Sequence, residues 1–342
     1  MKSALKAILS LTVLTSALPL MSFAEGSAGK SIYGEDNRVD FFSASADMQK
    51  LCDGVVSLWD AEQTVFDSAS KTYTFKTEKF GDKFNLCPGE KFREQTVGAF
   101  CSGSLVGEDL IMTAGHCIAD ETECAGTKLV FGFAIKKEGG QAPTKIAQRD
   151  VYSCRKIVKI AQGAEPSAVS SSGLGPDYAL IQLDRKVRGH KALAVNRNIT
   201  LEKGDAIFVI GHPAGLPLKI TAGATVRDTA PAGYFVTDLD TFAGNSGSPV
   251  FNAKTKLVEG ILVRGDKDFI QDPAGCTTMA VYSQNGGLGE DVTKISELQA
   301  FIPKLAVEKE AEAVVNANTI KTVGIGDIDA LRGLDAKDIS FQ

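Results

Sequence analysis

Short apolar runs separated by turn residues repeat along most of this chain, and they restrict its fold more than any other feature. Such runs predict β-strands, and helical periodicity is scarce before residue 292. The 34 glycines show no collagen-like period, so they indicate many turns. We therefore expect an all-β fold. The candidate strands are residues 55–59, 72–75, 100–106, 109–113, 129–135 and 155–160 in a first series, and 179–183, 206–210, 222–227, 234–237, 249–251 and 257–263 in a second.

A segment rich in Ser, Gly and Pro over residues 165–176 separates the two series, and this composition is typical of a loop between domains. After the second series, four apolar residues at helical spacing predict a C-terminal helix over residues 292–305. They are Val292, Ile295, Leu298 and Ile302. A C-terminal extension without a strong pattern covers residues 304–342.

The first 24 residues have the organisation of a secretory signal peptide. Lys2 and Lys6 precede an uncharged, mostly apolar stretch over residues 7–20, and small residues follow at Ser22 and Ala24. The stretch is too short to span a bilayer comfortably. We expect cleavage after Ala24, an exported protein that is secreted or periplasmic, and no stable membrane insertion once the signal is removed. An uncleaved membrane anchor is the alternative.

The charge balance excludes one class of partner. The chain has 37 Lys and Arg against 42 Asp and Glu, a net charge of −5. It lacks the basic excess or basic cluster that a nucleic-acid-binding surface needs. We therefore expect no nucleic-acid partner.

Export makes disulfides plausible. The chain has seven cysteines, an odd number, so at least one of them is free or pairs with another chain. Cys124 with Cys154 and Cys52 with Cys87 are plausible pairs that leave Cys276 over, but the sequence does not fix the pairing of these five.

Three short segments hold a histidine, an aspartate and a serine in a context suited to nucleophilic catalysis. His116, Asp177 and Ser246 stand in this order along the chain. A serine hydroxyl needs an adjacent base to become a nucleophile, and imidazole titrates near neutral pH. A carboxylate fixes the tautomer of that imidazole. Gly244 and Gly247 flank the serine and permit a tight turn, which can aim the backbone N–H groups of Gly244 and Ser246 at one oxyanion.

Each segment alone also fits a purely structural role. The serine segment could be an ordinary loop, Asp177 could cap a turn, and His116 could be a packed core residue. The chain has three histidines, and no second histidine or cysteine stands near His116 at zinc-finger spacing. We therefore expect neither a metal nor another cofactor. The combination of all three residues is more specific than any part of it.

Together these residues resemble the chymotrypsin-like (trypsin-like) serine peptidases, in particular the bacterial branch that includes the glutamyl endopeptidases. Residues 113–117 match the family's histidine motif, 177–180 the aspartate motif and 244–249 the serine motif, while 101–106 match the strand before the histidine. The resemblance covers about residues 50–303. It implies a disulfide between Cys101 and Cys117 beside the histidine.

The same resemblance implies a peptidase domain over residues 46–303, built of two six-stranded antiparallel Greek-key barrels. The first barrel would cover about residues 46–165 and the second about 177–303, with the cleft between them.

The resemblance also implies an exported serine endopeptidase that hydrolyses peptide bonds of protein or peptide substrates. His116 would act as general base and then acid, Asp177 would orient it, and Ser246 would form an acyl-enzyme. Two alternatives remain: a non-catalytic binding or adhesion protein on the same fold, and a narrow regulatory processing protease. The natural substrate and the oligomeric state stay open.

The substrate pocket is ambiguous at the level of sequence. Asp240 lies six residues before Ser246, the position that gives trypsin-like enzymes their preference for Lys and Arg. Arg264, in a segment expected to line the same pocket, could neutralise Asp240 or attract acidic side chains. Leu262 stands where the glutamyl-specific enzymes have a histidine, which argues against a strict preference for Glu. Asp240 could equally be a structural carboxylate that binds loop amides.

The segment over residues 25–45 is polar and predicts an N-terminal arm or a short pro-segment. In the trypsin-like branch an aspartate at the position of Asn245 pairs with a new N-terminal amine, an ion pair that asparagine cannot make. Removal of a pro-segment near Lys30 or Ser31, exposing Ile32, is one hypothesis, and packing of the arm on the second barrel is the other.

Two further histidines are assigned less specific roles. His212 follows a candidate strand, which indicates a turn histidine. His190 lies in a basic segment, and we expect it to be solvated.

Overall fold

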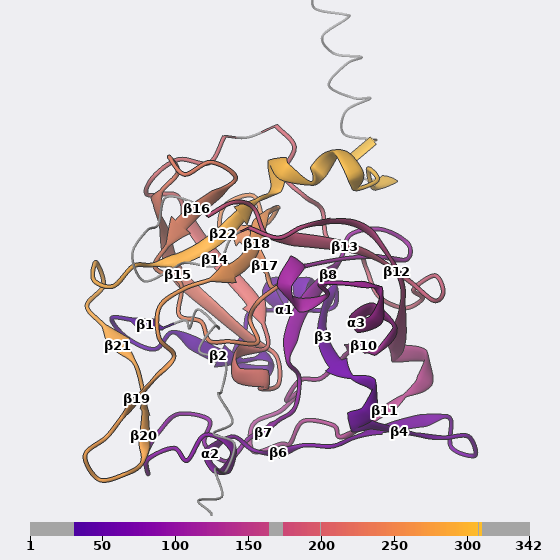
Figure 1. Cartoon of the computed structure of the whole chain (residues 1–342), viewed down its shortest axis with the longest axis horizontal. Helices are drawn as coiled ribbons and strands as arrows, with labels where there is room; N and C mark the ends of the chain where they lie inside the picture. The colour runs from indigo at the N-terminus through magenta and orange to yellow at the C-terminus, as the bar shows by residue number, and fades with distance from the viewer. Residues whose placement is uncertain (1–30, 164–173, 199, 307, 310–342) are drawn as a thin grey trace, which may run out of the picture.

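The computed structural model describes residues 31–163, 174–198, 200–306 and 308–309. Two closed antiparallel β-barrels dominate these residues. In Figure 1 the purple and magenta strands of the first barrel lie beside the orange strands of the second. The expected all-β fold of two six-stranded barrels is confirmed.

The first barrel closes in the order β10-β12-β13-β9-β8-β3. Its strands are β3 (Val55–Asp60), β8 (Cys101–Leu105), β9 (Leu110–Thr113), β10 (Thr127–Phe131), β12 (Val151–Ala161) and β13 (Tyr178–Leu183). β13 pairs with both β12 and β9, so the first barrel extends to Leu183. The expected boundary at residues 165–177 is therefore wrong. A turn-rich composition marks a loop, but it does not reveal which strands pair across that loop.

The second barrel closes in the order β14-β17-β18-β22-β16-β15, with β15 returning to β14. Its strands are β14 (Ala206–Gly211), β15 (Lys219–Asp228), β16 (Tyr234–Thr237), β17 (Pro249–Asn252), β18 (Val258–Arg264) and β22 (Glu290–Lys294). A short strand of the N-terminal arm, β2 (Arg38–Asp40), adds to β15.

Shorter elements surround the barrels. The additional strands are β1 (Ile32–Tyr33), β4 (Thr64–Asp67), β5 (Thr72–Phe75), β6 (Glu78–Lys79), β7 (Thr96–Val97), β11 (Lys145–Ala147), β19 (Phe269–Gln271), β20 (Thr277–Met279) and β21 (Val281–Tyr282). The α-helices are α1 (Ala46–Cys52), α2 (Phe80–Lys83) and α3 (Glu121–Ala125). In the described part of the chain no helix is long and apolar enough to cross a membrane.

The C-terminal helix expected over residues 292–305 does not form as such. Val292 belongs to β22, and two 3-10 helices follow, η6 (Ile295–Glu297) and η7 (Gln299–Phe301). The four apolar residues of the pattern are all buried, so the pattern located the core correctly. Val292 is paired with Phe235 and Leu262, and these strand pairings override the local helical spacing. The extension beyond residue 309 lies outside the described residues, as does the predicted signal peptide.

Three disulfides join the chain. Cys101–Cys117 and Cys124–Cys154 form as expected. The third is Cys87–Cys276, so the suggested Cys52–Cys87 pair is wrong, and Cys276 is not the cysteine left over.

The third disulfide depends on a long-range contact. The Cys87 N–H donates to the Thr277 carbonyl at 2.8 Å, and this backbone contact brings the two cysteine-bearing segments together. The two cysteines are 189 residues apart, so their positions in the sequence do not reveal that they pair. Cys52 is a free, buried thiol, and burial raises its pKa to about 12.

The described part of the N-terminal arm packs on the second barrel. β1 pairs in parallel with β21, and β2 pairs with β15. Ser31, Ile32 and Tyr33 are buried. Backbone N–H groups of the arm therefore reach the buried carboxylate of Asp240.

Candidate active site

His116 and Asp177 meet because β9 and β13 are neighbours in the first barrel. His116 lies in the 3-10 helix η3 (Gly115–Cys117) just after β9, and Asp177 immediately precedes β13. The register pairs Ala179 with Thr113, which brings the two side chains together. Asp177 Oδ2 lies 2.5 Å from His116 Nδ1, and Oδ1 accepts the His116 backbone N–H at 3.1 Å.

The exposure of this pair is asymmetric. The His116 side chain is 34% exposed, whereas that of Asp177 is 3% exposed. A carboxylate can only accept hydrogen bonds, so Nδ1 carries the proton and donates it to Asp177. In the neutral ring Nε2 is then the proton acceptor. This is the tautomer that a general base needs.

Two residues that the sequence did not single out support the aspartate. A Cβ at Gly115 would lie 2.6 Å from Asp177 Oδ1 and would collide with the Ala161 carbonyl, so only glycine lets the carboxylate approach. The Thr293 hydroxyl of β22 accepts the Asp177 N–H at 3.0 Å and donates to the Asp177 carbonyl at 2.8 Å. The second barrel thus holds the aspartate of the first.

Ser246 lies in a tight turn before β17. Gly244 and Gly247, on either side of it, have φ angles of 92° and 89°, which glycine adopts at no steric cost. A Cβ at Gly247 would collide with the Ser102 carbonyl. The Ser246 carbonyl accepts the Ser102 N–H at 2.8 Å. Backbone of the first barrel therefore holds the serine turn of the second.

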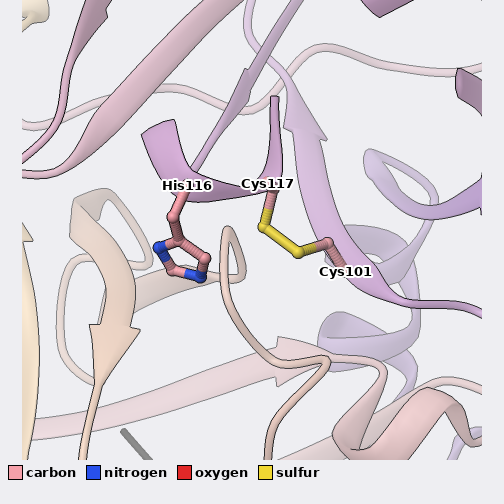
Figure 2. A group of neighbouring side chains, drawn as sticks. All are labelled: Cys101, His116 and Cys117. Carbon is pink, nitrogen blue, oxygen red and sulfur yellow. A yellow bond between two sulfur atoms is a disulfide. The ribbon is translucent and has the colours of Figure 1, made fainter. Parts of the chain in front are cut away.

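His116 and Ser246 face the same cavity, which has a volume of about 730 Å³. Residues of both barrels line it, including Asp60, Phe100, His116, Gly244, Ser246 and Arg264. Figure 2 shows the His116 ring beside the Cys101–Cys117 disulfide. The expected histidine, serine and oxyanion glycine thus share one cleft, and Asp177 lies behind the histidine.

The model of the family described as trypsin-like peptidase domain matches residues 101–261. The chain carries a trypsin-like peptidase domain. The matched segment includes His116, Asp177 and Ser246. It begins at Cys101 and ends within β18, so it spans strands of both barrels.

The relatives of this peptidase domain are distant. A glutamyl endopeptidase of Bacillus licheniformis is 28% identical over 44% of this chain and 45% of its own length. A probable periplasmic serine endoprotease of Halomonas elongata, described as DegP-like, is 25% identical over 54% of this chain and 33% of its own length. The solved structure of the Vibrio cholerae VesB protease aligns at 15% identity with a TM-score of 0.43, over 78% of this chain and 66% of that one. The chain spans less than half the length of these two curated relatives.

In the described residues, two groups of side chains could bind a metal by their spacing, but two of the three members of each group form a disulfide. Cys101, His116 and Cys117 place ligand atoms within 4.8 Å of one another, as do Cys87, Asp272 and Cys276. In each group the two sulfurs are bonded to each other, which is the yellow bond in Figure 2 for the first group. A disulfide sulfur is not a thiolate ligand, so each group offers a metal one side chain.

Of the three pocket candidates Asp240, Leu262 and Arg264, it is Arg264 that lines the cavity. Its guanidinium donates to Asp291 Oδ2 at 3.2 Å and to the Gly175 carbonyl at 3.1 Å. Arg264 therefore neutralises Asp291 rather than Asp240. Burial raises the pKa of Asp291, and the nearby guanidinium opposes that shift.

Asp240 binds the N-terminal arm. Oδ1 accepts the Tyr33 N–H and Oδ2 accepts the Asn37 N–H, both at 2.8 Å. The residue is 1% exposed, and burial raises its pKa to about 6 although the two N–H groups oppose this. Asp240 does not contribute to the lining of the cavity. These contacts match the alternative in which the carboxylate binds loop amides.

Leu262 acts on the site through its backbone. Its side chain is fully buried in the core of the second barrel. Its carbonyl accepts the Gly247 N–H at 2.8 Å, and its N–H donates to the Ser248 carbonyl at 3.0 Å. Leu262 thus supports the turn that carries Ser246.

The remaining singled-out residues have structural surroundings. Asn245 is buried and accepts the Ser248 hydroxyl at 3.2 Å. His212 is buried, and burial lowers its pKa to about 3. The expectation that His190 is solvated is wrong. Its ring stacks on Phe131 with a centroid distance of 4.1 Å, and its Nδ1 lies 2.8 Å from Asp53 Oδ1.

Proposed function

We propose that this protein is an exported serine endopeptidase that cleaves peptide bonds through His116, Asp177 and Ser246. The observation that carries the proposal is the 2.5 Å contact between His116 Nδ1 and Asp177 Oδ2, made behind a cavity that His116 and Ser246 both line. The carboxylate fixes Nε2 as the acceptor, and the opposite barrel supplies the nucleophile.

In this mechanism Ser246 Oγ attacks the scissile carbonyl while His116 Nε2 takes its proton. Asp177, 3% exposed, stabilises the imidazolium that forms. The backbone N–H groups of Gly244 and Ser246 stabilise the oxyanion of the tetrahedral intermediate. His116 then donates its proton to the leaving amine, which leaves an acyl-enzyme on Ser246. Water, deprotonated by the same imidazole, hydrolyses this ester.

Two features favour action outside the cytoplasm. Three disulfides join the chain, and disulfides persist in oxidising compartments. The first 24 residues have the composition of a cleavable signal, and such a signal directs export. The substrate is then a protein or peptide met in the periplasm or outside the cell.

Hydrolysis of a peptide library, followed by mass spectrometry of the products, tests this function. The secreted protein should produce internal cleavages, and Ser246→Ala should abolish them. Cleavage at very few sequences would favour the narrow processing protease. A folded wild-type protein that cleaves nothing would instead favour the non-catalytic binding protein.

A further inference from the structure

Ser102 contacts both sides of the nucleophile turn from the opposite barrel. It lies in β8 and is fully buried. Its N–H donates to the Ser246 carbonyl at 2.8 Å, and its hydroxyl donates to the Gly244 carbonyl at 2.7 Å. Its own carbonyl accepts the Thr113 hydroxyl at 2.7 Å. Ser102 of the first barrel thus binds the carbonyls of Gly244 and Ser246, the two residues whose N–H groups would stabilise the oxyanion.

The Ser102 hydroxyl also has a fixed orientation of its own. Its oxygen accepts the His212 N–H at 2.9 Å, so its proton is directed to the Gly244 carbonyl. His212 begins a short loop that includes Ala214, whose φ of 53° is unusual for a residue other than glycine. The Ala214 N–H donates to the Ala243 carbonyl at 2.5 Å. The two peptide groups on either side of Gly244 are therefore both anchored.

These anchors determine where the Gly244 N–H points. In a trans peptide the C=O and N–H groups point in opposite directions. Since the Ala243 carbonyl faces the loop at Ala214, the N–H of the same peptide group, which belongs to Gly244, points away from that loop. Glycine has almost equal access to positive and negative φ, so Gly244 alone would not hold this orientation.

We propose that Ser102 is a positioning residue for the oxyanion hole: its hydroxyl bridges the His212 N–H to the Gly244 carbonyl and fixes the peptide group that follows Gly244. This prevents the rotation of Gly244 that would turn its N–H out of the catalytic orientation. The inference rests on the proposed function. In this interpretation a side chain of the first barrel, Ser102, positions an oxyanion donor of the second barrel, the Gly244 N–H, before the substrate binds. The mature active site therefore depends on the docking of the two barrels at this hydroxyl.

Ser104 provides a matched control. It lies two residues along the same strand and is equally buried, and among the described residues its hydroxyl has no hydrogen-bond partner. Ser104→Ala and Ser102→Ala remove the same atom from the same strand, but only the second removes a contact to the nucleophile turn. A general loss of packing would affect the two variants alike.

The test compares kcat, KM and the inhibition constant of a peptidyl trifluoromethyl ketone, which forms a tetrahedral oxyanion on the serine. Loss of one oxyanion donor costs about a hundred- to thousandfold in kcat. Misplacement of one donor in Ser102→Ala should therefore lower kcat about tenfold or more, with KM within about twofold of wild type. The inhibition constant should rise by the same factor as kcat/KM falls. Ser104→Ala should keep wild-type kcat, and Ser102→Thr, which keeps the hydroxyl, should recover most of the activity.

If Ser102→Ala does not fold by circular dichroism, Ser102→Cys takes its place, because a thiol fills the site but donates weakly. Wild-type kcat in Ser102→Ala, or an equal loss in Ser104→Ala, would overturn the inference and leave the proposed function standing. A wild-type protein without peptidase activity would overturn both.

Discussion

Replacement of Asp177 by asparagine should abolish most of the activity without unfolding the protein. The two oxygens of this carboxylate accept from two different groups of one residue: Oδ2 faces His116 Nδ1 at 2.5 Å, and Oδ1 accepts the His116 backbone N–H at 3.1 Å. A carboxamide offers one accepting oxygen and one NH₂ group. It cannot satisfy both contacts.

Of the two orientations of the D177N carboxamide, the one with the lower free energy leaves the enzyme inactive. If its oxygen faced Nδ1, its NH₂ would oppose a backbone N–H and leave a buried donor unpaired, at a cost of about 1–3 kcal/mol. If its oxygen keeps the backbone N–H, the NH₂ donates to Nδ1 and moves the imidazole proton to Nε2. Ser246 then has no base. Loss of the correct tautomer is expected to lower kcat about 10⁴-fold, which is about 5 kcal/mol of barrier.

Steady-state kinetics on a cleaved library peptide would measure this loss, and urea unfolding would show that the fold persists. Asp53→Asn is a matched control, because Asp53 Oδ1 faces His190 Nδ1 at 2.8 Å and Oδ2 accepts the Lys191 N–H at 2.9 Å. It should leave kcat/KM unchanged. A D177N protein within tenfold of wild type, or an equal loss in D53N, would refute the assignment of Asp177 as the orienting carboxylate.

Two further predictions concern stability. The Cys87–Cys276 disulfide closes a loop of 189 residues and Cys124–Cys154 one of 30, so replacing each pair by alanine should cost about 5 and about 4 kcal/mol respectively; urea unfolding that gave the reverse order would contradict the loop-entropy argument. Burial raises the pKa of Asp240 from 3.8 to about 6, so its protonated form stabilises the fold below about pH 4, and this contribution is lost as pH rises through 6. Relative to Asp240→Asn, the wild type should lose about 2 kcal/mol of unfolding free energy between pH 4 and pH 7. A difference between the two proteins that does not change with pH would mean that the pKa of Asp240 is not raised in the folded state.

The residues of the candidate site could be predicted because each lies in a short local motif. Glycines beside Ser246 and the apolar run after Asp177 indicate a tight turn and a buried strand without any tertiary information. The strands were recognisable for the same reason. Their pairing was not, since β13 joins the first barrel through contacts with β9 and β12, although it follows a segment whose composition resembles a domain boundary.

The supporting residues could not be predicted, because their roles depend on contacts between distant parts of the chain. Ser102 and Gly244 are 142 residues apart, and Thr293 and Asp177 are 116 apart. A serine or threonine in a strand carries no local sign of such a partner. The same holds for Cys87 and Cys276, whose pairing depends on where β20 lies beside the segment that follows α2.

The sequence permits two interpretations of Asp240, as a specificity residue or as a structural carboxylate. Asp240 stands where a specificity carboxylate is expected, yet it accepts backbone N–H groups of Tyr33 and Asn37. The sequence contained both partners, but only the three-dimensional structure brings β1 and β2 to the second barrel. Under the proposed function, specificity would come from other groups that line the cleft, among which Arg264 is already paired with Asp291.

The most direct test of the account is to label the purified protein with a fluorophosphonate probe and to map the adduct by mass spectrometry. A single adduct on Ser246 is predicted, absent in Ser246→Ala and formed at least about a thousandfold more slowly in His116→Ala. Asp53→Asn should label at the wild-type rate. A folded wild-type protein that remains unlabelled, or that is labelled on another residue, would contradict the claim that His116 and Asp177 activate Ser246.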